Sequence, residues 1–549
     1  MGFGYDRYCA LVVLQTTQGL GAYLISEVEG ALEKGVAVGF DGRHGSRGFA
    51  WIAAQALLAR GFRVSLLEAG LAATPLLAFA VAHGGCAAGV MITASHNPPQ
   101  DNGFKVFDGR TGCQIVSPVD EAVAAAIEEN LEPWPRPPET ELRASDRLSD
   151  PTEEVTEAYF ASMREALCFR GGADVEHAPR ACYTALHGVG APFVTRACAE
   201  FGLLEPVPVA EQISPDPDFP TVAFPNPEEG RATWALAFAT GDREECELCI
   251  ANDPDADRLA VAERCAEEAD GWRSFSGNEI GAMLAHWVFT QWTERRRRGG
   301  GGAGAGAGGE GANKGVAMLA SAVSSKLLRA MAAKEGFHFE ETLTGFKWLG
   351  NGAKRLKEDG YDVLFMFEEA IGFAFGEHLL DKDGVAAAAV LLELAAYLRA
   401  TEGLTLAGYL DRIRAEYGFF AGRQGYYIAS DPSVSAAVFA RLREIGYVDS
   451  LAGMPVTSIR DLGRGTDTAN ADGKATLPPD PLMVTLRLEP FGELTIRASG
   501  TEPKLKVYVE CVDEEDQARA MATAEALYAA VYDDILTPIE GLQKPPISD

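Results

Sequence analysis

Short apolar runs are followed by longer alanine- and leucine-rich stretches in the first part of the chain. Val36–Phe40 precedes Gly48–Arg60, and Arg63–Leu67 precedes Pro75–His83. A short apolar run suits a buried strand, whereas the longer stretches have the length and composition of helices. Strands that alternate with helices are typical of α/β layers, so this region is predicted to hold a sheet covered by helices.

The same alternation returns twice further along the chain. Ala181–Leu186 precedes Gly190–Phe201, and Gly315–Leu319 precedes Ser321–Glu335. We therefore expect three similar α/β domains in succession.

The pattern changes toward the C-terminus, where strand-like runs follow one another without intervening helices. These runs are Pro481–Leu488, Glu493–Ala498 and Lys504–Cys511, and a final helix is expected at Glu514–Tyr532. Strands and helices that are segregated in this way predict a smaller C-terminal α+β domain. The expected fold class is thus α/β, with three similar α/β domains and a smaller α+β domain.

Proline-rich and low-complexity segments suggest where the domains are separated. Pro133–Pro138 is expected to carry the chain out of the first domain, and the polar Glu267–Gly271 to separate the second from the third. Arg295–Arg298 and the run Gly299–Gly311 have too little apolar volume for a core and predict a disordered, solvated insertion. The predicted domains are residues 1–148, 149–270, 271–410 with an insertion at 295–314, and 411–549.

Composition limits the classes of partner. The 48 basic and 79 acidic residues give a net charge of −31, which disfavours binding to nucleic acid or an anionic membrane. A few local cations can still hold a phosphorylated small molecule, so phosphate chemistry is not excluded. No obligate protein partner is inferred.

Cysteine use and hydropathy point to the cytoplasm. Ten cysteines in 549 residues are too dilute for a disulfide scaffold, and we interpret Cys246-x-x-Cys249 as core or strand cysteines because no second pair accompanies it. The apolar stretch Val385–Leu398 is interrupted by Glu393 and is shorter than the roughly 20 residues of a spanning helix. We expect a cytoplasmic protein without a membrane segment.

Ser95 lies where a predicted buried strand ends. The strand Gly89–Thr93 is followed by Ala94-Ser95-His96-Asn97-Pro98-Pro99, which cannot continue a sheet. Reactive groups in α/β sheets are found at strand ends, so Ser95 is a candidate nucleophile with His96 or Lys105 nearby. An ordinary turn is the alternative, and a serine hydrolase is disfavoured because the Gly-x-Ser-x-Gly motif is missing.

Three aspartates stand at alternate positions directly after the apolar strand Leu248–Ala251. Asp253, Asp255 and Asp257 can direct three hard oxygen donors to one ion, which suits Mg²⁺. An EF-hand is excluded because Arg258 and Arg264 occupy its glycine and glutamate positions. An acidic turn without an ion is the alternative.

Further candidates for substrate contacts lie later in the chain. The segment Arg497–Lys504 is basic and rich in hydroxyl groups, as a phosphate-binding turn would be, although a plain hairpin turn fits as well. Lys347 follows the flexible Gly345, and Glu368 and Glu369 end the predicted strand Val363–Phe367. Carboxylates bind sugar hydroxyls, but each of these pieces taken alone also fits a structural role.

Taken together, these motifs resemble the α-D-phosphohexomutase superfamily, in particular its phosphoglucomutase-2 and phosphopentomutase branch. Four segments in the same order carry the resemblance: Thr93–Pro98, Asp253–Arg258, Glu368–Gly372 and Arg497–Pro503. The resemblance implies four domains around a central cleft, with a fourth domain mobile enough to close over the substrate.

The resemblance also implies a mechanism. Phosphorylated Ser95, with Mg²⁺ on Ser95, Asp253, Asp255 and Asp257, would give its phosphoryl group to a sugar monophosphate. The resulting sugar bisphosphate, which is both intermediate and activator, would return the other phosphate to Ser95. Phosphate would thereby move between C1 and C5 of a pentose or C1 and C6 of glucose.

The site residues follow from the matching positions. Those implied are Lys105 and His96 for catalysis, Arg258 for the phosphoserine, Gly345, Lys347, Glu368 and Glu369 for the sugar, and Arg497, Ser499, Gly500 and Thr501 for the non-reacting phosphate. Arg43 is a further cation that could contact substrate, although it matches a different family position from the arginine discussed next.

The resemblance breaks at the N-terminus. Members of the superfamily carry Phe-Gly-Thr-Ala-Gly-Leu-Arg just before the residues matched by Met1–Gly4, and this sequence lacks that segment. We therefore expect the first strand and one active-site arginine to be missing. Two alternatives to a mutase remain: a glucose 1,6-bisphosphate synthase, and an inactive pseudoenzyme that binds phosphosugar.

Overall fold

The computed structural model describes residues 9–298, 314–490, 492–498, 504–536 and 539–543, so expectations about Met1–Gly4 and Gly299–Gly311 fall outside it. The chain divides into two compact units. The first comprises Met1–Leu319 and Gly345–Tyr409, and the second comprises Ala320–Thr344 and Leu410–Asp549. Each unit is described by itself.

The first sheet of the first unit has the strand order β5-β4-β3-β1-β2-β6. Its strands are β1 (Val36–Phe40), β2 (Val64–Leu66), β3 (Ala88–Ile92), β4 (Phe104–Asp108), β5 (Cys113–Gln114) and β6 (Leu148–Ser149). β1 is parallel to β2 and β3, whereas β4 runs antiparallel to β3. All five residues of β1 and of β3 are buried, as expected for parallel strands with both faces covered.

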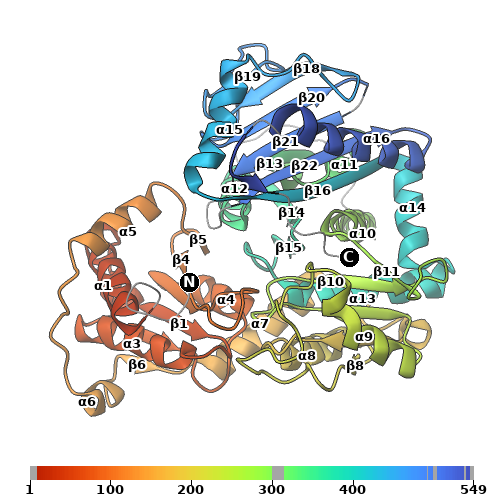
Figure 1. The fold of residues 1–549 in the computed structure, drawn as a ribbon. Coiled ribbons are helices and arrows are strands. Elements are labelled where there is room, and N and C mark those ends of the chain that lie inside the picture. The colour runs from red at the N-terminus through yellow and green to blue at the C-terminus, as the bar shows by residue number, and fades with distance from the viewer. Residues whose placement is uncertain (1–8, 299–313, 491, 499–503, 537–538, 544–549) are drawn as a thin grey trace. The chain divides into compact units, whose positions relative to one another are not determined.

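Helices cover the first sheet, as the alternating pattern predicts (Figure 1). They are α1 (Ala10–Glu27), α3 (Ser46–Ala59), α4 (Thr74–His83) and α5 (Val119–Glu128). Most of α4 is buried, including Pro75 in its first turn, where a missing N–H costs nothing.

The second sheet has the order β11-β10-β9-β7-β8, and the helices of this part of the chain are α7 (Thr152–Leu167), α8 (Ala191–Phe201) and α9 (Arg231–Arg243), of which α9 packs on β7 and β9. Its strands are β7 (Ala181–Thr184), β8 (Val207–Pro208), β9 (Leu248–Ala251), β10 (Ala260–Arg264) and β11 (Trp272–Ser274). Cys246 and Cys249 are buried, the latter in β9, which confirms their interpretation as core cysteines.

The segment expected to separate the second domain from the third lies within a hairpin. Glu267–Gly271 is in the turn between β10 and β11, whose strands pair through Arg264 and Trp272. A polar, glycine-containing turn has the same composition as a linker, so composition alone could not distinguish the two.

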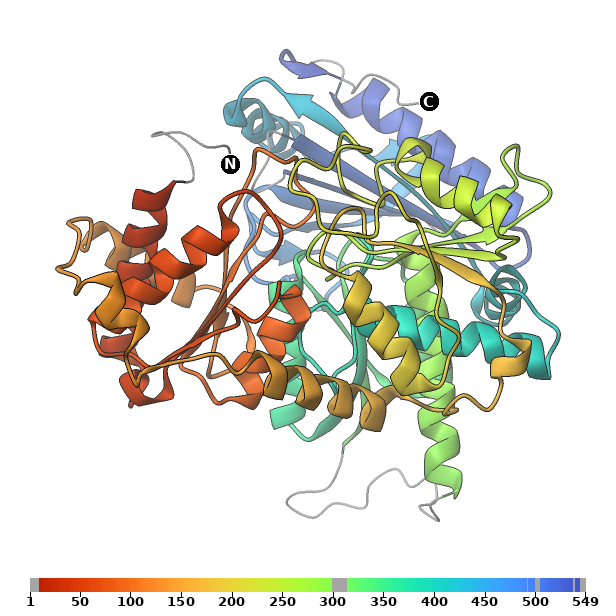
Figure 2. The same ribbon diagram turned by 90° about the horizontal axis from the view of Figure 1, so that it is seen from below.

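In the third sheet β14 (Tyr361–Glu368) lies between β12 (Gly315–Ser321) and β15 (Gly372–Ala374). Its helices are α10 (Gly277–Arg298), α12 (Phe346–Glu358) and α13 (Gly384–Thr401). α10 is a long helix that ends with the four arginines (Figure 2).

Arg295–Arg298 are thus helical and not part of a disordered insertion, and all four are exposed. Arg295 donates to the carbonyl oxygens of Ala166 and Cys168, and its guanidinium stacks 4.4 Å from the centre of the Phe169 ring. A long arginine side chain can fold back on apolar surface, which a count of charges along the sequence does not reveal.

The second unit is built on an antiparallel sheet with the order β17-β18-β20-β21-β22-β16-β23, and β19 pairs with β18. The strands are β16 (Phe419–Ala429), β17 (Ser450–Leu451), β18 (Met454–Asp461), β19 (Thr466–Asp467), β20 (Met483–Leu488), β21 (Gly492–Ala498), β22 (Lys504–Asp513) and β23 (Leu542–Gln543). The three predicted strands are confirmed as β20, β21 and β22.

Helices α11 (Leu327–Glu335), α15 (Pro432–Glu444) and α16 (Gln517–Ala530) and strand β13 (His338–Thr342) also belong to this unit, and α14 (Leu406–Tyr417) begins in the first unit. The helix expected at Ser321–Glu335 begins only at Leu327. Ser325 Oγ accepts a hydrogen bond from the Leu327 N–H, so the serines ahead of the helix form a turn instead of its first residues.

α13 is the helix among the described residues that is long and apolar enough to cross a membrane by length and composition. In this structure 78% of its 18-residue apolar stretch is buried, as in the core helix of a globular domain. The cytoplasmic location stays a prediction.

Glu393 is a buried carboxyl group on α13. It is 1% exposed and accepts hydrogen bonds from the backbone N–H groups of Phe169 (3.1 Å) and Arg170 (2.7 Å). Burial raises the pKa of Glu393 to about 7, against the opposing effect of these two donors. Between the ordinary carboxyl pKa and about 7, the folded chain therefore binds a proton that the unfolded chain has lost.

We predict that ionisation of Glu393 lowers the stability of the folded chain as pH rises from the ordinary carboxyl pKa to about 7, because the ionised form is disfavoured only in the folded state. Glu393→Gln, which cannot ionise, should remove that dependence. Thermal unfolding of both proteins at pH 5 and pH 8 checks this: the melting temperature of the variant relative to the parent should rise with pH. A difference in melting temperature between variant and parent that does not change with pH would contradict the prediction.

Candidate active site

Ser95 lies two residues beyond Thr93 in the loop that follows β3. Its backbone is in the left-handed region, with φ of 51°, and its N–H donates to Thr93 Oγ1 at 2.9 Å. The Ser95 hydroxyl donates to Asp253 Oδ2 at 2.9 Å and lies 3.3 Å from His96 Nδ1. The structure therefore joins the predicted nucleophile directly to the predicted metal loop.

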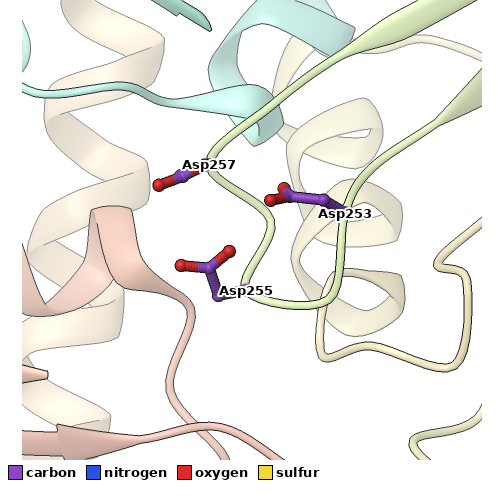
Figure 3. Close-up of side chains that lie close together, drawn as sticks. All are labelled: Asp253, Asp255 and Asp257. Carbon is purple, nitrogen blue, oxygen red and sulfur yellow. The ribbon is translucent and has the colours of Figure 1, made fainter. Parts of the chain in front are cut away.

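The three aspartates lie on the loop that joins β9 to β10, and their side chains surround one shared space (Figure 3). Asp253, Asp255 and Asp257 are all 0% exposed, and one ligand oxygen from each lies within 4.8 Å of the others. Asp255 Oδ1 and Asp257 Oδ1 have no hydrogen-bond donor among the described residues. Buried carboxylate oxygens without donors are costly, so this donor set fits a divalent cation.

Lys105 on β4 contributes a positive charge to the same loop. Its Nζ lies 2.6 Å from Asp255 Oδ2 and 2.8 Å from Asp257 Oδ2. Burial by itself would lower the pKa of Lys105, but the two carboxylates outweigh burial and raise it. In this arrangement Lys105 is an ammonium group that the two carboxylates hold in its charged form.

The aspartates respond differently to the same surroundings. Burial raises the pKa of Asp253 well above its usual value, and the neighbouring carboxylates Asp255 and Asp257 reinforce this effect. Burial would also raise the pKa of Asp255, but Lys105 and the Thr74 hydroxyl, which donates to Asp255 Oδ2 at 2.6 Å, lower it overall. A cation on Asp253 would favour its ionised form.

Lys382 belongs to the site and was missed as a functional residue by sequence reasoning. It is 8% exposed, and its Nζ lies 3.3 Å from Asp257 Oδ2 and 3.9 Å from Glu368 Oε1. In the sequence it stands between Asp381 and Asp383, where a lysine is indistinguishable from one in a surface turn. Asp383 is the N-cap of α13 and accepts from the Ala386 N–H, which fixes the start of the helix beside Lys382.

The predicted sugar-binding residues lie in two places. Glu368 and Glu369 are both 8% exposed at the end of β14, and burial raises the pKa of Glu368 despite the opposing charge of Lys382. Gly345, with φ of 102°, precedes α12, and Lys347 Nζ lies 3.7 Å from Asp120 Oδ2. Their contacts with a sugar stay predictions.

Arg258 and His96 lie near the nucleophile. Arg258 pairs with Glu228 at 3.0 Å, and its Nε lies 3.9 Å from Asp253 Oδ2. Burial, followed by the charges of Arg258 and Lys382, holds the pKa of His96 well below its usual value, so the imidazole is neutral. The predicted contact of Arg258 with the phosphoserine stays a prediction.

Two expectations are not settled by this site. Arg497 lies on β21 in the second unit, and Ser499, Gly500 and Thr501 fall outside the described residues. Arg43 is in the first unit but is only 4% exposed.

Comparison with known proteins identifies the four domains. Sequence models of the phosphoglucomutase/phosphomannomutase α/β/α domains I, II and III match residues 6–134, 157–266 and 276–417, and that of the C-terminal domain matches residues 469–527. The predicted succession of three α/β domains and a different C-terminal domain is confirmed, whereas the proposed boundaries stay predictions.

Two curated relatives match over most of their length. Human phosphopentomutase is 43% identical over 523 residues, which are 93% of this chain and 83% of that protein. Human glucose 1,6-bisphosphate synthase is 38% identical over 554 residues, which are 98% of this chain and 86% of that protein.

A solved structure supports the fold alone. The open form of the phosphoprotein pp63/parafusin from Paramecium superposes with a TM-score of 0.69 at 17% identity, covering 97% of this chain and 93% of that one. Since the domain models cover more than half of the chain in order, and relatives exceed 30% identity over nearly all of it, the chain belongs to the phosphoglucomutase/phosphomannomutase family of mutases.

Proposed function

We propose that this mutase moves phosphate between C1 and C5 of pentose phosphates, and between C1 and C6 of glucose phosphates, through a phosphorylated Ser95. The observation that carries the proposal is the hydrogen bond from Ser95 Oγ to Asp253 within a buried acidic triad. The choice of pentose as leading substrate rests on the relative named phosphopentomutase.

The first half-reaction transfers the phosphoryl group from Ser95 to a free hydroxyl of the sugar monophosphate. The bond between phosphorus and Ser95 Oγ breaks as a bond from phosphorus to the sugar oxygen forms. The hydroxyl proton leaves the sugar, and Ser95 Oγ gains a proton, so charge and atoms balance. The second half-reaction is the reverse step at the other phosphate of the bisphosphate, which restores phospho-Ser95.

We assign the proton transfers to Lys105. It lies as an ammonium beside Asp255 and Asp257, and Ser95 Oγ becomes strongly basic as it leaves phosphorus, so the ammonium can protonate that oxygen. The Ser95 hydroxyl donates its single proton to Asp253, so the neutral His96, 3.3 Å away, can orient Ser95 Oγ by donating to it from an Nδ1–H. Glu368 and Glu369 would accept hydrogen bonds from sugar hydroxyls.

Ser95, Asp253, Asp255 and Asp257 would hold Mg²⁺, because they offer hard oxygen donors of which two lack a protein partner among the described residues. A bound Mg²⁺ would neutralise charge on the transferring phosphoryl group. Lys382 brings a second positive charge to Asp257 and limits the repulsion between the buried carboxylates.

Ser95 is expected to become phosphorylated when the purified protein is incubated with Mg²⁺ and glucose 1,6-bisphosphate. Mass analysis of the Ser95 peptide checks this, and Ser95→Ala should leave that peptide unmodified and abolish mutase turnover. Phosphate found on another residue, or none on Ser95, would contradict the proposed route and favour the pseudoenzyme.

Loss of one metal-site carboxylate should weaken Mg²⁺ activation. For Asp257→Asn we expect the Mg²⁺ concentration for half-maximal activity to rise by at least about 10-fold, because the charge and geometry at the ion both change. Titration of Mg²⁺ after removal of metal by EDTA measures this. Glu211→Gln, which changes an exposed carboxylate elsewhere in the same domain, should leave the titration unaltered.

Substrate trials should separate the mutase from the synthase. With ribose 1-phosphate as substrate and a trace of sugar bisphosphate, we expect ribose 5-phosphate to accumulate. With glucose 1-phosphate and 1,3-bisphosphoglycerate, a synthase would make glucose 1,6-bisphosphate in stoichiometric amounts. Faster formation of the bisphosphate than of the isomerised sugar phosphate would overturn the mutase assignment.

A further inference from the structure

Arg43 makes an unusual set of contacts with the loop that carries Ser95. It lies three residues beyond β1 and its side chain is 1% exposed. Its terminal guanidinium nitrogens donate to four backbone carbonyl oxygens of one loop, those of Ser95, Asn97 (2.7 Å), Pro98 (2.9 Å) and Asp101 (3.2 Å). The Arg43 side chain therefore binds carbonyl groups at both ends of residues 95–101.

A carboxylate completes this arrangement. Arg43 Nε lies 3.3 Å from Asp41 Oδ2, and that same oxygen accepts a hydrogen bond from Thr93 Oγ1 at 2.6 Å. Thr93 Oγ1 in turn accepts from the Ser95 N–H. The peptide groups of Ser95 are therefore held from both sides, the N–H through Thr93 and Asp41, and the C=O by Arg43.

These contacts use the hydrogen-bonding capacity of Arg43. A guanidinium has five N–H groups, and here the four on the terminal nitrogens donate to carbonyl oxygens, whereas the buried Nε lies at ion-pair distance from Asp41 without a hydrogen-bond partner among the described residues. Burial lowers the pKa of Arg43, and the nearby carboxylate of Asp41 opposes that shift and keeps the group charged. Because the terminal N–H groups are occupied and Nε is buried, Arg43 presents no accessible N–H to a substrate phosphate.

We propose that Arg43 is a positioning residue for phosphoryl transfer, which acts by fixing the Ser95 loop and not by binding substrate. This inference rests on the proposed function of Ser95. Ser95 has a positive φ, which is strained for a residue with a side chain and persists only where its surroundings hold it. The Arg43 contacts supply that restraint while Ser95 Oγ gains and loses the phosphoryl group.

The proposal predicts which kinetic constant changes. The loop holds the reacting oxygen and not the sugar, so loosening it should lower kcat while KM stays nearly constant. Displacement of a reacting atom by about 1 Å can cost about 10²-fold in rate, which sets the expected size of the effect. Lysine cannot replace this arginine, because one ammonium has three donors and lacks the planar fork that reaches four carbonyl oxygens.

The test compares Arg43→Lys and Asp41→Asn with the parent protein and with Arg110→Lys. Arg110 is a matched control, since it lies in the same domain and pairs with Asp108 at 2.8 Å but does not contact the Ser95 loop among the described residues. Each protein is measured for kcat and KM with ribose 1-phosphate, and for amide hydrogen exchange of the peptide that spans residues 93–103.

For Arg43→Lys we expect kcat to fall by about 10²-fold, KM to change by less than about 3-fold, and exchange to rise in residues 93–103. Asp41→Asn should shift the same quantities in the same direction by less, and it keeps the test possible if Arg43→Lys does not fold. Arg110→Lys should match the parent in kcat, in KM and in hydrogen exchange of residues 93–103.

Two results would overturn the inference. One is a rise in KM with unchanged kcat, which would make Arg43 a substrate ligand. The other is unchanged exchange in residues 93–103. Failure of the parent protein to become phosphorylated on Ser95 would instead reject the proposed function, while the exchange measurement would still report whether Arg43 restrains the loop.

Discussion

The first unit is organised around a balance of buried charge. Three aspartates with no exposed surface occupy one loop, and Lys105 and Lys382 are the lysines that face them among the described residues. An uncompensated carboxylate in such a place would be strongly disfavoured, so cations from other parts of the chain must approach. Lys105 comes from the first sheet and Lys382 from the segment before α13, which draws distant parts of the chain to one point.

Three of the nine described non-glycine residues with positive φ lie at the same place. Ser95, Ala256 and Ile371 are non-glycine residues with positive φ, one in each of the three loops that carry the candidate site. Such conformations cost of order 1–3 kcal/mol each and persist where other contacts over-determine them. Backbone hydrogen bonds between loops supply such contacts. The Thr74 N–H donates to the Asp255 carbonyl oxygen, and the Leu259 N–H donates to the Ile371 carbonyl oxygen. The loops therefore hold one another in position.

This arrangement connects stability with chemistry. The hydrogen bonds that restrain the loops leave the Ser95 hydroxyl directed at Asp253 and leave one oxygen each of Asp255 and Asp257 without a donor in the described part of the chain. A preorganised site of this kind does not have to rearrange its dipoles during the reaction, which is the main source of electrostatic stabilisation in enzymes. Arg43 extends the same principle to the far side of the Ser95 loop.

The sequence by itself determined the succession of α/β domains, the approximate positions of the strands that it predicted, and the segments that contain Ser95 and the three aspartates. Strands such as β1 and β3 are buried on both faces and are therefore continuous apolar runs in the sequence. The aspartates are close together in the sequence, so the local pattern was enough to predict both features. The start of α11 and the hairpin turn at Glu267–Gly271 depend on side-chain hydrogen bonds and strand pairing, which composition does not encode.

Only the tertiary structure decided the contacts of Lys382 and Arg43. Lys382 looks like a residue of a charged turn until folding brings it to Asp257, more than a hundred residues away in the chain. Arg43 resembles a free cation for substrate until its guanidinium is seen to be occupied by the carbonyl groups of the Ser95 loop. The physical reason is the same in both cases: a charged side chain acquires its function from partners distant in sequence, and hydrophobic periodicity carries no information about them.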